Sequence, residues 1–330
     1  MHETKLNTCR PQNRRAPETF SNIALRRGPA LRERSFTNEH RVSASPSFDY
    51  DEAFSRNLGW VTETEQAQLR NTRVCIAGMG GVGGIYLLTL ARLGIGAFSI
   101  ADFDTFAPAN TNRQAGATVS SMGRPKVDVM LEMASDINPD LDVRIFDRGL
   151  DTTNLDAFLA DGDAYLDGLD FFALDIRREV FGRCAARGIP ATTVAPLGMG
   201  AALLNFVPGG MHFDEYFRLA GQPEDEQALR FLVGLSPAML QLRYLVDPTR
   251  VDLARRRGPS TVIAVQLCSG LAAAQVVKLV LKRGDVIAAP SGLHFDAYRN
   301  QLKRTWRPGG NANPLQRLLM AVARRRLSAR

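Results

Sequence analysis

The chain has 330 residues, of which 45% are hydrophobic and 23% are charged, a balance typical of one large folded domain or two small ones. Its formal net charge is +7, but the excess lies at the ends: residues 1–50 hold nine Lys/Arg against five Asp/Glu, and residues 303–330 hold eight Lys/Arg and no acid. The middle is mildly acidic, which argues against a basic nucleic-acid groove in the core and leaves only the tails open to nucleic acid, anionic lipid or an acidic partner.

The cysteines and the most apolar stretch exclude further classes of protein. The four cysteines form no CxxC pair, so we predict neither a zinc site nor a secreted disulfide scaffold, and we expect a cytoplasmic protein. Residues 261–281 are strongly apolar, but two glutamines and a lysine interrupt them. We therefore predict a buried helix there and no membrane span.

Three regions follow one another along the chain. Residues 1–48 are polar and lack periodicity, so we predict a disordered basic tail. Residues 49–302 are predicted to form the folded domain. Residues 303–330 are predicted to be a basic C-terminal tail, in which residues 315–327 could form a short amphipathic helix.

Strands and helices alternate in the first two thirds of the domain. The predicted elements are a helix at 64–69, a strand at 73–77, a helix at 85–93, a strand at 97–101, a helix at 126–137, a strand at 143–146, a helix at 154–159, a strand ending at 167–170, a helix at 177–187 and a strand at 191–194. This alternation predicts an α/β fold: a doubly wound, mostly parallel sheet with helices on both faces.

The pattern changes after Gly198. We predict an antiparallel strand at 201–206, an irregular helical insert at about 210–258, the apolar helix and a last strand near 293–297. Together these segments would form an antiparallel C-terminal extension of the sheet.

A glycine-rich string joins the first strand to the next helix. It reads Gly78-Met-Gly80-Gly81-Val-Gly83, and glycines at this place permit a tight turn and let backbone amides approach a phosphate. Asp102 follows the next strand, where a carboxylate can bind a ribose hydroxyl. These features alone fit NAD and ATP equally well.

Three charged residues further along favour a triphosphate. Arg113 lies in the loop after Asp102, Lys126 begins the next predicted helix, and Asp170 lies at the carboxyl end of a later strand. Displacement at a nucleoside triphosphate needs cations and magnesium to carry the charge that moves onto pyrophosphate. Asp170 is the predicted magnesium ligand, because Asp167 should still lie inside the strand.

In this order of motifs the chain resembles the ThiF/MoeB/HesA adenylyltransferases, bacterial relatives of ubiquitin-activating enzymes. The motifs are the GxGGxG loop, the DxD at Asp102 and Asp104, the NxxR that runs from Asn110 to Arg113, the GxxK that ends at Lys126, and Asp170. The resemblance covers residues 54–300 and is strongest over 54–200.

The resemblance implies roles for these residues. Asp102 would hold the ATP ribose, Gly81 would lie against the nucleotide, Asn112, Arg113 and Lys126 would contact the phosphates, and Asp170 would bind Mg²⁺. Family members are usually homodimers in which an arginine of one subunit reaches the ATP of the other. Arg56 resembles that residue.

The chain also departs from the family pattern. The arginine expected five residues after Asp170 arrives two residues late, as Arg177, and Asp175 becomes a second candidate acid. No cysteine lies between Cys184 and Cys268, both of which fall in apolar predicted helices, so a thioester or persulfide relay is not predicted. The chain resembles members that stop at adenylation or let a small nucleophile attack the adenylate.

The sequence thus predicts an ATP- and Mg²⁺-dependent adenylyltransferase that converts a carboxylate to an acyl-adenylate. The carboxylate could belong to a small molecule, a peptide, a carrier-protein C-terminus or a modified tRNA base. The alternatives are an NAD(P)-dependent oxidoreductase and a non-catalytic binding module of the same fold.

Overall fold

The computed structural model describes residues 34–35, 48–252 and 255–328 of the chain. The tail predicted over residues 1–48 falls largely outside this range. Within it, Arg34–Ser35 form a short strand, β1, that pairs with a strand of the main sheet.

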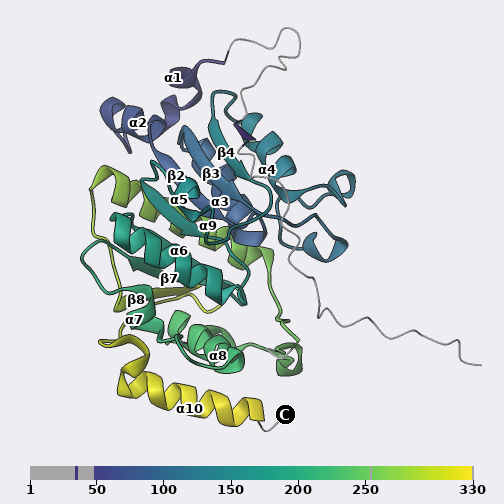
Figure 1. Cartoon of the computed structure of the whole chain (residues 1–330), viewed down its shortest axis with the longest axis vertical. Coiled ribbons are helices and arrows are strands. Elements are labelled where there is room, and N and C mark those ends of the chain that lie inside the picture. Colours follow the sequence, from purple (N-terminus) through teal and green to yellow (C-terminus); the bar gives the residue numbers. More distant parts are fainter. Residues whose placement is uncertain (1–33, 36–47, 253–254, 329–330) are drawn as a thin grey trace, which may run out of the picture. The chain divides into compact units, whose positions relative to one another are not determined.

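The described residues form a nine-stranded sheet with helices on both faces, as predicted (Figure 1). The strands are β1 (Arg34–Ser35), β2 (Arg73–Ala77), β3 (Ala97–Ala101), β4 (Asp142–Phe146), β5 (Ala164–Asp167), β6 (Ala191–Leu197), β7 (Gly200–Phe206), β8 (Ser291–Asp296) and β9 (Gln301–Trp306). Their order is β1-β4-β3-β2-β5-β6-β7-β8-β9. All pairs formed within the set β2 to β6 are parallel. Strands β1, β7, β8 and β9 pair antiparallel with their neighbours.

Ten α-helices and several short 3₁₀ turns connect the described strands. The helices are α1 (Tyr50–Ala53), α2 (Glu63–Arg70), α3 (Gly81–Arg92), α4 (Lys126–Ser135), α5 (Leu155–Phe158), α6 (Leu174–Arg187), α7 (Phe213–Phe217), α8 (Glu224–Leu235), α9 (Val262–Leu281) and α10 (Pro314–Ser328). The predicted helical insert at 210–258 corresponds to α7, α8 and two 3₁₀ turns.

The central strands are buried on both faces. Every residue of β2 is buried, and its side chains alternate between two hydrophobic clusters. Val74 and Ile76 pack with residues of α3, α4 and α9, whereas Cys75 and Ala77 pack with residues of α5, α6 and α7. This burial explains why β2 and β3 appear in the sequence as continuous apolar runs instead of alternating ones.

Helix α9 is the long apolar segment of the described chain. By length and composition it could cross a membrane, and 44% of its most apolar window is buried inside the protein. It packs against α3 and strands β6 and β7, and Thr89 and Ser269 join it to α3 through a 2.6 Å hydrogen bond between their hydroxyls. The core helices of soluble proteins meet the same length and composition test, and these contacts match the buried helix that was predicted.

The C-terminal segment differs from the expected tail. The sheet continues past residue 302, because β9 pairs with β8 along its whole length after a turn in which Asn300 has a φ of +51°. Helix α10 then packs against α8 through Met320. Strand β9 lacked a sequence signal because an edge strand exposed on both faces needs no apolar alternation.

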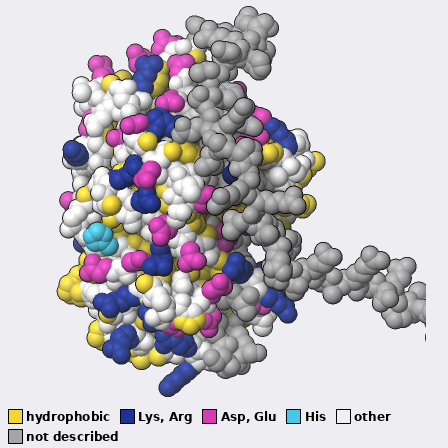
Figure 2. All heavy atoms as spheres, viewed as in Figure 1, with side chains coloured by type: hydrophobic (Ala, Val, Ile, Leu, Met, Phe, Trp, Pro, Cys, Tyr) yellow, Lys and Arg dark blue, Asp and Glu magenta, His cyan; other side chains and the backbone are white. Residues whose placement is uncertain are grey.

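The outer side of α10 remains exposed and basic. Leu315 and Leu318 are 57% and 61% exposed, and Arg317 and Arg325 lie on the surface beside them. Figure 2 shows Lys and Arg side chains gathered at the lower end of the molecule, where Figure 1 places α10. Arg324 also bonds Glu226 of α8, which ties the helix to the domain.

Candidate functional site

The glycine string forms the turn from β2 into α3. Gly78 has a φ of +88°, and a Cβ there would lie 2.2 Å from the carbonyl oxygen of Gly168. A Cβ at Gly83 would lie 1.7 Å from the carbonyl oxygen of Gly78. These two glycines therefore let the start of α3 pack directly on the ends of β2 and β5.

Gly80 and Gly81 differ from this pair because added side chains would meet little. A Cβ at Gly80 would lie 3.6 Å from Nε2 of Gln114, and one at Gly81 would lie 3.4 Å from Cγ2 of Val265. Gly80 caps α3 without a side-chain hydrogen bond. The first amides of α3 are thus available to an anion, which the positive end of the helix dipole also favours.

Asp102, which follows the end of β3, forms a hydrogen bond with the glycine string. Its Oδ2 accepts a 2.7 Å hydrogen bond from the backbone N–H of Met79, and its Oδ1 accepts one of 2.8 Å from the N–H of Asp104. Burial raises the pKa of the Asp102 carboxyl above its usual value, against the opposing effect of the Lys126 charge. The carboxylate keeps further lone pairs that could accept hydroxyl donors.

Lys126 is held by the second aspartate of the DxD motif. Its Nζ lies 2.8 Å from Oδ2 of Asp104, and its backbone N–H donates to the carbonyl of the same residue. The Lys126 side chain is 7% exposed and stands at the first position of α4. A buried ammonium at a helix N-terminus is unfavourable because the helix dipole has the same sign there, so Asp104 compensates it directly.

The loop from Asn110 to Gln114 lies beside the glycine string. Asn110 accepts a hydrogen bond from Ala107 N–H, and Asn112 donates one of 3.0 Å to the carbonyl of Ser260, just before α9. The Arg113 guanidinium donates to Ala109 O and Asn112 Oδ1, and its Cγ would lie 4.0 Å from a Cβ at Gly81. Asn110 is therefore engaged in shaping the loop, whereas Arg113 adjoins the amino end of α3.

Asp170 lies just beyond β5, exposed, on a loop that adjoins the glycine string. Its Oδ1 accepts from Phe172 N–H, and its Oδ2 has no partner among the described residues. Asp167 lies inside β5, where it forms a fully buried ion pair with Arg177, with 2.9 Å between Oδ2 and Nε. Asp167 thus lies in the strand, as expected, and the assignment of the metal to Asp170 stays a prediction.

Arg56 does not lie with these residues. Its neighbour Asn57 donates to the carbonyl of Leu93, which ends α3, whereas the glycine string begins α3. A helix of this length spans about 18 Å. Arg56 itself is exposed, at the opposite end of α3 from the site of its own chain.

Gln114 also lies in this region, and no sequence motif pointed to it. Its side chain is buried, yet Oε1 has no hydrogen-bond partner among the described residues. The only sequence signal was its position directly after the NxxR motif.

The described cysteines carry no sign of a reactive thiol. Cys75, Cys184 and Cys268 are all buried, and burial raises the pKa of each, that of Cys75 to about 12. A thiol that stays protonated and enclosed is a poor nucleophile.

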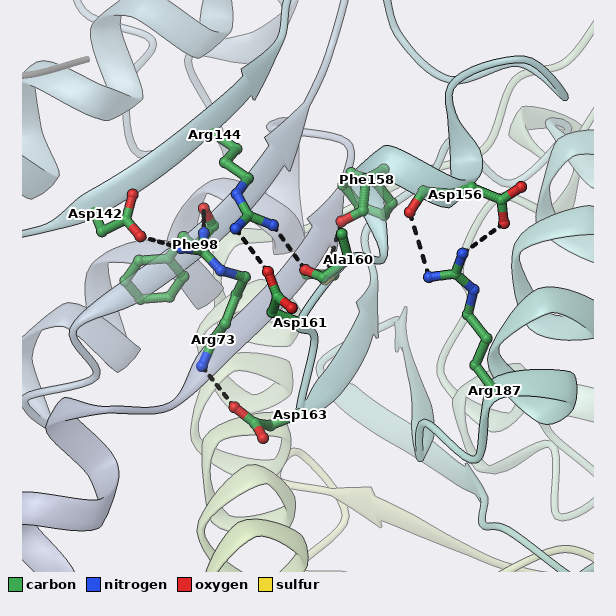
Figure 3. Close-up of polar contacts among 11 residues, drawn as sticks. Arg73, Phe98, Asp142, Arg144, Asp156, Phe158, Ala160, Asp161, Asp163 and Arg187 are labelled. Atoms are coloured by element: carbon green, nitrogen blue, oxygen red, sulfur yellow. Dashed lines mark hydrogen bonds and ion pairs between the residues drawn. The ribbon is translucent and has the colours of Figure 1, made fainter. Parts of the chain in front are cut away.

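A network of ion pairs lies at the end of the parallel strands opposite the glycine string. Figure 3 shows Arg73 with Asp142, and Arg144 with Asp161, at the amino ends of the parallel strands. A polar hollow of about 400 Å³ opens beside them and is also lined by Tyr50 and Arg70. Its charges largely pair with one another, and it lies away from the glycine string.

Comparisons with known proteins identify the family of the chain. A profile of the ThiF family matches residues 54–317. The tRNA threonylcarbamoyladenosine dehydratase of Haemophilus influenzae is 34% identical over 123 residues, 37% of this chain and 47% of that protein. The molybdopterin-synthase adenylyltransferase of Escherichia coli is 31% identical over 141 residues, 43% of this chain and 56% of that protein. The chain thus spans about half the length of the curated relatives it matches.

Solved structures share the fold at low identity. Selenomethionine PaaA superposes with a TM-score of 0.59 and 17% identity, over 82% of this chain and 77% of that one. The complex of E. coli MccB with AMPCPP and MccA gives 0.58 and 18%, over 79% and 73% of the two chains. Because the family profile covers most of the chain and these folds match, the chain belongs to the ThiF family.

Proposed function

We propose that this protein is an adenylyltransferase, which uses Mg-ATP to convert a substrate carboxylate to an acyl-adenylate. The observation that carries the proposal is the arrangement at the amino end of α3, where Asp102 bonds the glycine string, the Lys126 charge acts on Asp102, and the side chain of Arg113 passes beside Gly81. Relatives named as adenylyltransferases, for molybdopterin synthase and for the sulfur carrier ThiS, and an E. coli MccB structure with ATP support it.

The chemistry needs positioning and charge neutralisation more than proton transfer. A carboxylate oxygen bonds to the α-phosphorus of ATP, the bond from that phosphorus to the bridging oxygen breaks, and pyrophosphate leaves with the electron pair. A carboxylate is already ionised at neutral pH, so no protein base is required. Arg113, Lys126 and the α3 amides would stabilise the charge that moves onto the pyrophosphate.

Asp170 is the residue that would hold Mg²⁺. Nucleotide-bound Mg²⁺ commonly takes one or two protein carboxylates, with phosphate and water oxygens as its other ligands. An exposed carboxylate with one unengaged oxygen fits that demand, although no group of three or more candidate ligand side chains occurs among the described residues. The metal would supply positive charge to the phosphates.

We propose that the adenylate passes directly to its final acceptor. The three described cysteines are buried with raised pKa values, which disfavours a thiolate relay from any of them, while Cys9 lies outside the described residues. The substrate carboxylate would belong to a small molecule, a peptide or carrier-protein C-terminus, or a modified tRNA base. We further propose a cytoplasmic homodimer in which Arg56 reaches the site of the partner subunit.

Nucleotide binding and exchange test this function. Mg-ATP should raise the melting temperature of the protein and NAD(H) should not, since only a ligand that binds the folded state stabilises it. Candidate carboxylates are then screened for ATP–pyrophosphate exchange. Lys126→Ala and Asp170→Ala should each lower exchange by about 100-fold or more with circular dichroism unchanged. Lys303→Ala, on exposed β9, is the matched control and should retain activity.

Two results would contradict the proposal. Stabilisation by NAD(H) but not by Mg-ATP would favour an oxidoreductase. Full exchange activity in both the Lys126 and Asp170 variants would remove the residues on which the mechanism depends.

A further inference from the structure

Helix α10 carries apolar side chains on two sides. On its inner side Met320 is 4% exposed and packs with residues of α8. On its outer side Leu315, Leu318 and Val322 are 57%, 61% and 39% exposed. A surface helix that covers a core needs only its inner side to be apolar. Packing within the described part of the chain therefore does not explain the three outer side chains.

These three residues, which we call the outer stripe, lie along one side of the helix. They stand at positions i, i+3 and i+7, the spacing that brings side chains into line on an α-helix. Helix α10 has 15 residues and is about 22 Å long. In Figure 1 it lies at the outer edge of the fold, next to α8. The outer stripe is thus carried by a helix at the rim of the molecule.

Arginines accompany the outer stripe. Arg317 adjoins Leu318 in the sequence, and Arg325 follows Leu318 by seven residues, which places it on the same side of the helix. Both arginines are exposed, and neither forms an ion pair with a residue that the structure describes. Residues 303–330 hold eight Lys/Arg and no acid. The outer side of α10 therefore combines apolar side chains with uncompensated positive charge.

An anionic lipid surface fits this combination best. Helices that lie in the plane of a membrane interface place apolar side chains beside Lys and Arg, and both kinds contribute to binding. A nucleic acid would use the arginines for its phosphates and leave the leucines in water. A specific protein interface typically buries about 800 Å² on each partner, which is more than three partly exposed side chains provide.

We propose that the outer side of α10 binds membranes that contain anionic lipid, with the outer stripe at the acyl boundary and Arg317 and Arg325 at the headgroups. The ThiF family match ends at residue 317, inside α10, so most of this surface lies beyond the matched domain. The proposal does not depend on adenylation, because neither a nucleotide nor a carboxylate takes part in the contact.

Sedimentation with vesicles tests this surface on the full chain. The protein should sediment with vesicles made of equal parts phosphatidylcholine and phosphatidylglycerol, and it should not sediment with vesicles of phosphatidylcholine alone. Raising the salt from about 0.1 M to about 0.5 M should weaken the binding, because salt screens the attraction between the arginines and the headgroups.

Two variants separate the apolar and the charged contributions. Leu318→Gln should bind the mixed vesicles about 5- to 10-fold more weakly, because it removes apolar area from the outer stripe. Arg325→Gln should bind them about 5-fold more weakly, because it removes one charge near the headgroups. The matched controls are Leu242→Gln and Arg92→Gln, which remove an exposed leucine and an exposed arginine from other parts of the surface and should bind like the wild type. Thermal melts of all four should change little, since each side chain is exposed.

Other results would overturn the proposal in recognisable ways. Sedimentation without phosphatidylglycerol, or with neither kind of vesicle, would exclude a docking surface for anionic lipid. Unchanged binding in both the Leu318 and Arg325 variants would place the contact elsewhere, for example in the basic residues 1–50. Binding that depends on Arg325 but not on Leu318, together with binding of single-stranded RNA, would assign the surface to nucleic acid. A lower molecular mass of Leu318→Gln in light scattering would assign the outer stripe to a contact between copies of the chain.

Discussion

His294 is buried in β8, and only one of its two ring nitrogens has a hydrogen-bond partner among the described residues. Its Nδ1 lies 3.1 Å from Ser236 Oγ, and its Nε2 has no partner among the described residues. Burial lowers the pKa of His294 from 6.5 to about 4, although the charge of Asp296 opposes the shift. The imidazole is therefore neutral in the folded protein throughout the physiological range.

We predict that His294 makes the fold sensitive to mild acid. Between pH 6.5 and about 4 the unfolded chain binds a proton that the folded chain rejects, so the free energy of unfolding falls as the pH falls through this window. The full effect is about 3 kcal/mol. His294→Asn retains a polar group near Nδ1 but cannot titrate, so denaturant unfolding at several pH values should show a shallower loss of stability.

His212→Asn is the control for this prediction, since His212 is exposed at the start of α7. If the two variants lose stability equally between pH 6.5 and 4, other groups are responsible for the acid sensitivity.

At the scale of elements, the loop from β5 to α6 is organised by one buried arginine. The Arg177 guanidinium bonds Asp167 and donates to the carbonyls of Leu169, Asp170 and Phe171, and it lies 4.7 Å from the ring centre of Phe231. Helix α6 begins at Leu174, which places Arg177 in its first turn. Arg177 thus positions the loop that carries Asp170.

We predict that Arg177→Lys loosens this loop. Lysine keeps the charge but cannot reproduce a planar fork of donors, so two or three buried carbonyls lose their partners. The variant should lose about 2–4 kcal/mol of stability. In exchange assays at saturating ATP it should need more Mg²⁺ for half-maximal activity, since the Asp170 backbone is less fixed.

Arg178→Lys is the neighbouring control. Arg178 pairs with Asp214 on the surface, and such pairs contribute about 0–1 kcal/mol. An Arg177→Lys variant that is destabilised but keeps its Mg²⁺ dependence would limit Arg177 to a structural role.

The sequence predicted those elements whose environment leaves a strong pattern. Strands β2 and β3 were predicted to the residue, because their apolar runs end at glycine and at Asp102. Helix α3 begins four residues earlier than predicted. Glycines usually end helices, but here they allow the first turn of α3 to pack directly against the strands. Strand β9 and the unpaired state of Gln114 depend on contacts with distant residues, which one sequence does not encode locally.

At the scale of the whole molecule, the two ends of α3 separate two groups of residues. The glycine string and its charged neighbours lie at the carboxyl ends of the parallel strands, where ligands of doubly wound folds bind. Arg56 and the neighbouring Trp60, which is 85% exposed, lie at the other end. A hollow of about 320 Å³ beside Trp60 is lined by Leu58, Val61 and Arg283. An exposed tryptophan beside an apolar hollow is typical of a surface that meets another protein.

This separation makes the proposed homodimer testable by complementation. If Arg56 acts on the partner's site, Arg56→Ala and Lys126→Ala should each impair exchange when assayed alone. In a mixed dimer, one site would carry both defects and the other neither. After subunits of the two variants are mixed equally and allowed to exchange, half the dimers are mixed and half their sites are intact, so activity should recover to about a quarter of wild type.

Mixing Lys126→Ala with Asp170→Ala is the control, because both defects belong to the same subunit's site and every site in the mixture stays defective. A mixture of the Arg56 and Lys126 variants that recovers no activity, although it forms mixed dimers by mass spectrometry, would place Arg56 outside the partner's site.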